Sequence, residues 1–162
     1  MKKTAGILLA SMLFASPTYA ADQTQQYVNE GAGLITTFVD SLKGELMKSM
    51  KEGGPLKAIE ACKTLAPELA AAQSKNGWTI GRTSLKVRNP RNAPEPWEML
   101  VLQEFEKRKA AGEDPAKLVK AEIVEENGRK VFRMMKAIPM AAPCSGCHGE
   151  VVDEKIVAKI NE

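Results

Sequence analysis

The segment AEIVEENGRKVFRMMKAI, residues 121–138, decides the fold class. Its two halves, Ala121–Glu126 and Arg129–Ile138, flank Asn127-Gly128, the strongest short signal for a β-hairpin. A type I′ turn needs a positive φ at both central residues, which Asn-Gly tolerates. The sequence therefore predicts two antiparallel strands joined at Asn127-Gly128.

Helical patterns lie on both sides of this hairpin. Apolar residues recur every three or four positions from about Gln25 to Met50, which predicts one long amphipathic helix. Gly53-Gly54-Pro55 ends that helix and opens a second one, on whose buried face Cys62 falls. Further helices are expected from Pro96 to about Ala111 and from about Asp153 onward.

The segments between the helices have other patterns. From Trp78 to Arg88 apolar and polar residues partly alternate, which predicts one or two short strands before a loop over Asn89–Pro94. A second loop of small residues covers Pro139–Pro143. Because no repeat or composition break marks a second domain, we expect one α+β domain of helices and short antiparallel strands.

The first 20 residues are expected to be a signal peptide. Lys2 and Lys3 precede an apolar stretch over Ala5–Ser16, and Thr18-Tyr19-Ala20 offers the small residues of a cleavage site. Cleavage after Ala20 leaves residues 21–162 as the single domain. Since no later stretch reaches the roughly 20 apolar residues of a membrane helix, we expect a periplasmic protein that does not span the membrane.

Charge and histidine content exclude several classes of site. The chain has 23 basic and 20 acidic side chains, and loss of Lys2 and Lys3 leaves a net charge of about +1. This balance gives no basic field of the kind that nucleic acid binding requires. A single histidine, His148, excludes sites that need two imidazoles.

The pentapeptide CSGCH at residues 144–148 has the attachment pattern of a c-type haem. Cys144 and Cys147 would form thioethers to the porphyrin, and His148 would ligate the iron. Two residues between the cysteines let one tight turn present both sulfur atoms to the same porphyrin edge. The small Ser145 and Gly146 allow the backbone to lie close to the macrocycle. We therefore predict one covalently attached haem c.

Three other kinds of site use the same residue types. A thiol-disulfide oxidoreductase would carry the two cysteines at a helix N-terminus in a thioredoxin-like frame, which this sequence does not suggest. A zinc site would need a fourth ligand, either Cys62 or a carboxylate. A structural disulfide would leave His148 without a role.

The second axial position must be filled without another histidine. The candidates include the methionines after residue 20 and the odd cysteine, Cys62, which could also pack as a small buried apolar residue. The methionines are Met47, Met50, Met99, Met134, Met135 and Met140. Most of them are expected to fill the core. The residues alone leave this choice open.

Three stretches resemble a family of bacterial exported or membrane-linked c-haem domains. They are AIEACKTLAPELA (58–70), RTSLKVRNPRNAPEPWE (82–98) and CSGCHG (144–149). The resemblance covers most of the chain after the first helix and implies a PAS-like fold. It also implies that the iron is held by two residues matching His148 and Cys62.

The arginine-rich stretch offers partners for haem propionates, because a guanidinium binds a carboxylate with two hydrogen bonds. Arg82 is the best candidate among Arg82, Lys86, Arg88 and Arg91, although a solvated surface would also explain these side chains.

Two functions follow from these expectations. The first is a periplasmic mono-haem cytochrome c for low-potential electron transfer, because a thiolate ligand stabilises Fe(III). The alternative is a PAS-like haem sensor of redox state or gas, in which Cys62 leaves the iron on reduction or acidification. An enzymatic role is less expected, because no acid–base constellation accompanies the motif. The sequence does not identify the redox or signalling partner.

Overall fold

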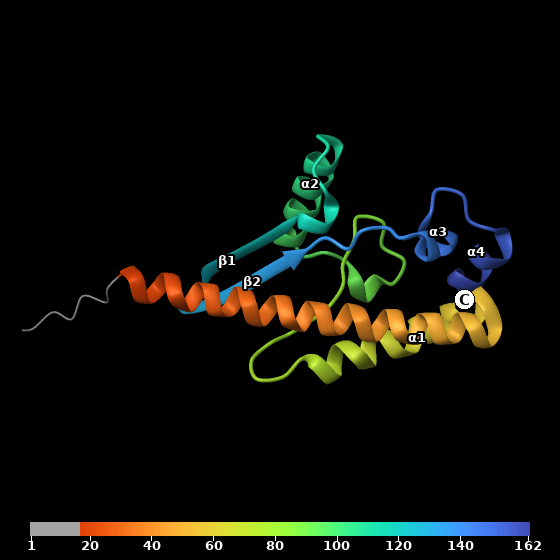
Figure 1. Cartoon of the computed structure of the whole chain (residues 1–162), viewed down its shortest axis with the longest axis horizontal. Coiled ribbons are helices and arrows are strands. Elements are labelled where there is room, and N and C mark those ends of the chain that lie inside the picture. The colour runs from red at the N-terminus through yellow and green to blue at the C-terminus, as the bar shows by residue number, and fades with distance from the viewer. Residues whose placement is uncertain (1–16) are drawn as a thin grey trace, which may run out of the picture.

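Figure 1 shows the computed structural model, which describes residues 17–162; the expected signal peptide lies mostly outside the described residues, in residues 1–16. The elements are α1 (Pro17–Gln73), η1 (Pro90–Asn92), α2 (Pro96–Ala110), η2 (Pro115–Lys117), β1 (Val119–Glu126), β2 (Arg129–Lys136), α3 (Ala142–His148) and α4 (Glu154–Asn161). A long N-terminal helix, a small antiparallel sheet and flanking helices confirm the predicted α+β class. No described helix is both long and apolar enough to cross a membrane.

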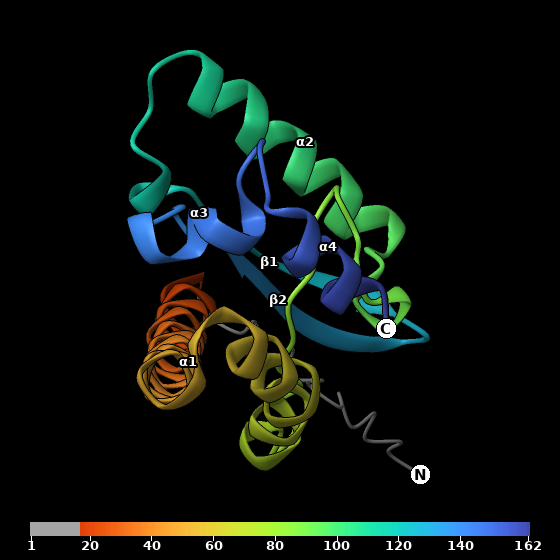
Figure 2. The same ribbon diagram turned by 90° about the vertical axis from the view of Figure 1, so that its right-hand side faces the viewer.

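Helix α1 is interrupted at two glycines. Gly53 has φ −159° and ψ 17°, and Gly54 has φ 70° and ψ −164°, so neither continues the helix. The conformation of Gly54 is open almost only to glycine. The chain reverses there, and a first arm (residues 17–52) and a second arm (residues 55–73) run side by side (Figures 1 and 2). The predicted break at Gly53-Gly54-Pro55 is confirmed.

The predicted hairpin is also confirmed. Strands β1 and β2 pair antiparallel, with Val119 opposite Lys136 and Glu126 opposite Arg129. The φ angles of Asn127 and Gly128 are 52° and 73°, both positive as a type I′ turn requires. Strand β1 begins two residues before the predicted Ala121, and β2 ends at Lys136 rather than Ile138.

One face of the hairpin packs on the first arm of α1 (Figure 1). The centre of the Phe132 ring lies 5.5 Å from the centre of the Tyr27 ring and 5.7 Å from the centre of the Trp78 ring. Next to them, Gly31 approaches Met134 so closely that a Cβ added to the glycine would lie 3.1 Å from the methionine sulfur. These contacts form an aromatic cluster between the hairpin and α1.

The other face of the hairpin packs on α2. Arg133 and Met135 alternate with the α1-facing residues of β2, as side chains along a strand do. The Arg133 guanidinium lies 4.4 Å from the centre of the Trp97 ring, and Met135 borders the buried cluster of Val101, Phe105 and Leu118. The sheet is therefore the middle layer between α1 and α2.

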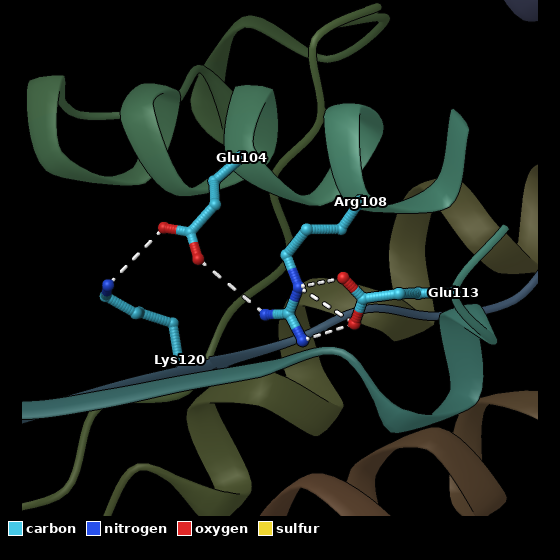
Figure 3. Close-up of polar contacts among 4 residues, drawn as sticks. All are labelled: Glu104, Arg108, Glu113 and Lys120. Atoms are coloured by element: carbon cyan, nitrogen blue, oxygen red, sulfur yellow. Dashed lines mark hydrogen bonds and ion pairs between the residues drawn. The ribbon is translucent and has the colours of Figure 1, made fainter. Parts of the chain in front are cut away.

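Ion pairs connect the end of α2 with the hairpin. Figure 3 shows Arg108 between Glu104 and Glu113, with Lys120 of β1 on the far side of Glu104. The Arg108 guanidinium donates from Nε and Nη2 to the Glu113 carboxylate at 2.8–3.1 Å. This network holds the turn after α2 close to the helix that precedes it.

The strands predicted between Trp78 and Arg88 do not form, so that prediction is wrong. The segment is irregular, with bends at Leu85, Lys86 and Arg88 before η1. Hydrogen bonds to its neighbours hold it in place: the Ile80 N–H donates to the Ser74 hydroxyl, and the Thr83 hydroxyl donates to the Asn92 carbonyl of η1. The apolar positions that suggested a strand include Trp78, which instead packs in the aromatic cluster.

Candidate functional site

The CSGCH motif forms the short helix α3 at the end of the molecule where α1 turns back (Figure 1). Cys144 and Cys147 are three residues apart on this helix, so their side chains lie on one face. Both are half-buried, whereas Ser145 and Gly146 are exposed. The two cysteines thus share one side of the helix, as attachment to one porphyrin edge requires.

His148, the last residue of α3, contacts a residue 60 positions earlier in the chain. The Arg88 Nη1 lies 3.1 Å from His148 Nδ1. Because a guanidinium only donates, Nδ1 accepts, and the neutral ring then carries its proton on Nε2. Burial, followed by the charges of Arg88 and Arg82, lowers the pKa of His148. The neutral imidazole, which is the metal-binding form, is favoured.

Cys62, on the second arm of α1, lies within electrostatic range of the motif. Burial is the main cause that raises the pKa of its half-buried thiol, and Cys147 and Cys144 raise it further. Arg82 acts in the opposite direction and lowers the pKa. The fold therefore brings together Cys62, Arg82 and both motif cysteines from three separate segments. No disulfide joins these three cysteines.

Apolar side chains are exposed on both sides of α3. Ile138 and Met140, just before the helix, are each 59% exposed, and Val151, just after it, is 93% exposed. Side chains of this kind gain free energy when a large apolar ring covers them. Two thiols on one face, a neutral imidazole, guanidinium groups and bordering apolar side chains together fit a covalently bound haem.

The alternatives find less support in this geometry. Among residues 17–162, no group of three or more His, Cys, Asp and Glu side chains is arranged to hold a metal ion. The two-stranded antiparallel sheet is not the frame of a thioredoxin-like protein. Met134 and Met135 pack against α1 and α2, respectively, as core residues, whereas Met140 is exposed.

Two contacts at the site were not expected from the sequence. Arg88 rather than Arg82 makes the direct hydrogen bond to His148, and no local pattern links residues so far apart. In addition, the Lys159 ammonium of α4 lies 3.0 Å from the Glu60 carboxylate. Glu60 precedes Cys62 by two residues. The predicted terminal helix thus contacts the arm that carries the odd cysteine, a link that only the tertiary structure reveals.

Comparison with known proteins gives one match. A family model described as Tll0287-like matches residues 11–161. No curated protein and no solved structure matches the chain.

Proposed function

We propose that this chain, which belongs to the Tll0287-like family, is a periplasmic mono-haem c-type cytochrome for low-potential electron transfer. In this proposal Cys144 and Cys147 attach the haem, and His148 and Cys62 are its axial ligands. Arg82 pairs with a haem propionate. Residues 1–20 direct export and are removed.

The observation that carries this proposal is that Cys62 lies within electrostatic range of both cysteines of the CSGCH motif. Cys62 and the motif lie 82 residues apart in sequence, on α1 and α3, and yet the Cys62 thiol interacts electrostatically with both motif cysteines. A buried packing role would explain Cys62 at many places in the fold. Its position beside the one haem-attachment motif favours a ligand role.

Each residue has a definable task in this site. The bound haem would supply a one-electron redox centre. His148 would hold the iron through Nε2, which requires its proton to lie on Nδ1, and Arg88, which now donates to Nδ1, would then have to leave that nitrogen. Cys62 would bind as a thiolate, which would favour the oxidised state and lower the reduction potential.

Spectroscopy of haem-loaded protein tests the Cys62 assignment. Wild type should show thiolate features in its ferric absorption and EPR spectra, and Cys62→Ser should lose them and have a higher reduction potential. Met140→Leu is a matched control, because it removes an exposed sulfur four residues from Cys144 and should change neither property. A wild-type spectrum without thiolate character that Cys62→Ser leaves unchanged would contradict the assignment.

Denaturing electrophoresis with haem staining tests the attachment. Cys144→Ala and Cys147→Ala should each keep haem through one thioether, with the reduced pyridine spectrum displaced to longer wavelength. The double variant should lose haem on denaturation. Cys62→Ser should keep both thioethers. Retention of haem by the double variant would exclude these two cysteines as the attachment points.

The interruption of α1 supports a second candidate function, a haem sensor with a switchable ligand. Along the chain, the second arm, which carries Cys62, is connected to the first arm through the non-helical Gly53 and Gly54. An arm with such a connection can move as a unit when Cys62 leaves the iron, and this movement could signal to a partner. Ferrous protein should then bind CO at the released position. A ferrous protein that stays six-coordinate and refuses CO would exclude this function.

A further inference from the structure

We infer that the loop between α1 and α2 docks an acidic electron-transfer protein. This loop, residues 74–94, is called the basic loop below. The inference rests on the proposed function, because the docked protein would exchange electrons with the site at α3. The inference specifies which surface of this protein the partner contacts and which charge the partner carries, neither of which follows from the motif.

Charge is strongly concentrated in the basic loop. Its 21 residues include five basic side chains and no acidic one: Lys75, Arg82, Lys86, Arg88 and Arg91. The rest of residues 21–162 carries 16 basic and 20 acidic side chains. The molecule is thus nearly neutral as a whole, with a positive loop and a negative remainder. Such a separation orients an approaching charged protein.

The basic side chains of the loop are available to a partner. None of the five forms an ion pair within the part of the chain that the structure describes. Lys75, Lys86, Arg88 and Arg91 are exposed, and only Arg82 is half-buried. Arg82 and Arg88 serve the proposed haem site, so Lys75, Lys86 and Arg91 are the side chains that an acidic partner could pair with without first breaking an internal ion pair.

The basic loop also borders the redox site. Arg88 contacts His148, and Arg82 acts on the Cys62 thiol. Between them, Leu85 and Val87 flank Lys86 and are 43% and 39% exposed. Exposed apolar side chains surrounded by charges are the composition of a small, transient protein interface. A partner bound here would lie next to the motif.

A compact acidic protein fits this surface better than an anionic membrane. An extended negative surface that touched the loop would also face the acidic remainder of the molecule, which it would repel. A compact protein can contact the loop alone. Membrane binding is nevertheless a distinct outcome of the experiment below.

The test compares two double variants that each remove two positive charges. Lys86→Gln with Arg91→Gln neutralises the loop but leaves Arg82 and Arg88 in place. Arg129→Gln with Lys130→Gln neutralises two exposed side chains at the hairpin turn, which lies at the opposite end of the molecule from α3 (Figure 1). Both variants have the same net charge, so a difference in their reaction with the partner shows that the position of the removed charges matters.

Plant-type ferredoxin, a small acidic electron-transfer protein, is the probe. With wild type, the second-order rate constant of reduction by ferredoxin should fall roughly tenfold from low to physiological ionic strength. The loop variant should be about three- to tenfold slower at low ionic strength, with a flatter salt dependence, and the hairpin variant should match wild type within about twofold. Equal rates for the two variants would overturn the inference.

Two further measurements separate the possible failures. Calorimetric titration of each protein with oxidised ferredoxin measures docking without electron transfer. One outcome is that the protein carries no haem and still binds ferredoxin in a salt-dependent way that the loop variant loses. This outcome would uphold the docking surface and reject the proposed function. The second measurement is co-sedimentation with phosphatidylserine vesicles. If the loop variant loses vesicle binding but binds ferredoxin as well as wild type does, the inference is overturned in favour of a membrane surface.

Discussion

At the scale of single residues, Gly31 marks the closest approach of α1 to the hairpin. A Cβ at this position would lie 3.1 Å from the Met134 sulfur and 3.4 Å from the Trp78 ring. Gly33, two residues on, has no atom within 4 Å of the corresponding point. The two glycines therefore have different roles in the same helix.

Substitution of these two glycines by leucine tests that difference. We expect Gly31→Leu to lower the free energy of unfolding by about 1–3 kcal/mol, because the side chain would overpack the aromatic cluster. Gly33→Leu should raise it by about 0.5–1 kcal/mol, because leucine is the better helix former. Urea unfolding followed by circular dichroism measures both. A loss of stability in both variants would mean that Gly33 is also packed.

At the scale of elements, the reversal within α1 depends on Gly54. Its φ of 70° and ψ of −164° lie in a region that costs other residues about 1–3 kcal/mol. Gly54→Ala should therefore destabilise the protein by about that amount, whereas Gly44→Ala, at an open position within the first arm, should stabilise it by about 0.5–1 kcal/mol. Thermal and urea unfolding measure the difference. Unchanged stability in Gly54→Ala would show that the reversal tolerates another backbone conformation.

Elements defined by local sequence were predictable, and those defined by distant contacts were not. Asn127-Gly128 specifies its turn through its own φ angles, and Pro96 fits the first turn of α2 through its fixed ring. The segment from Trp78 to Arg88 misled the strand prediction because its apolar residues serve a tertiary cluster. For the candidate site, the sequence indicated the motif but left the role of Cys62 open, and the contact between Arg88 and His148 depends on the whole fold.

At the scale of the molecule, aromatic residues are absent from the two segments that carry the three cysteines. None occurs in residues 53–77 or 133–162, whereas Tyr27, Trp78, Trp97, Phe105 and Phe132 all lie around the hairpin. The hairpin end thus has its own apolar core. A haem bound at α3 would add a large apolar ring to the end that lacks one.

Loss of the proposed haem should therefore affect the two ends unequally. We expect the double variant Cys144→Ala with Cys147→Ala, isolated without haem, to exchange amide hydrogens faster in α3, α4 and the second arm of α1. Strands β1 and β2 and helix α2 should keep their protection, because their buried cluster does not involve the motif. Hydrogen exchange with mass spectrometry compares this protein with haem-loaded wild type. Equal loss of protection throughout would indicate that the molecule unfolds as one unit.

Acid should destabilise the whole molecule through carboxylates paired across its elements. The hydrogen bond from Arg133 is the main cause that lowers the pKa of Glu122, and that from Arg108 lowers the pKa of Glu113. A lowered folded-state pKa means that the unfolded chain binds protons more readily, so this stability is present above pH about 4.3 and is lost as pH falls through the folded values. The urea midpoint should decline below that pH. Glu122→Gln with Glu113→Gln should flatten the decline, whereas Glu125→Gln, which removes a carboxylate without an ion pair among the described residues, should leave its slope unchanged. A decline as steep in the double variant as in wild type would assign the acid sensitivity to other groups.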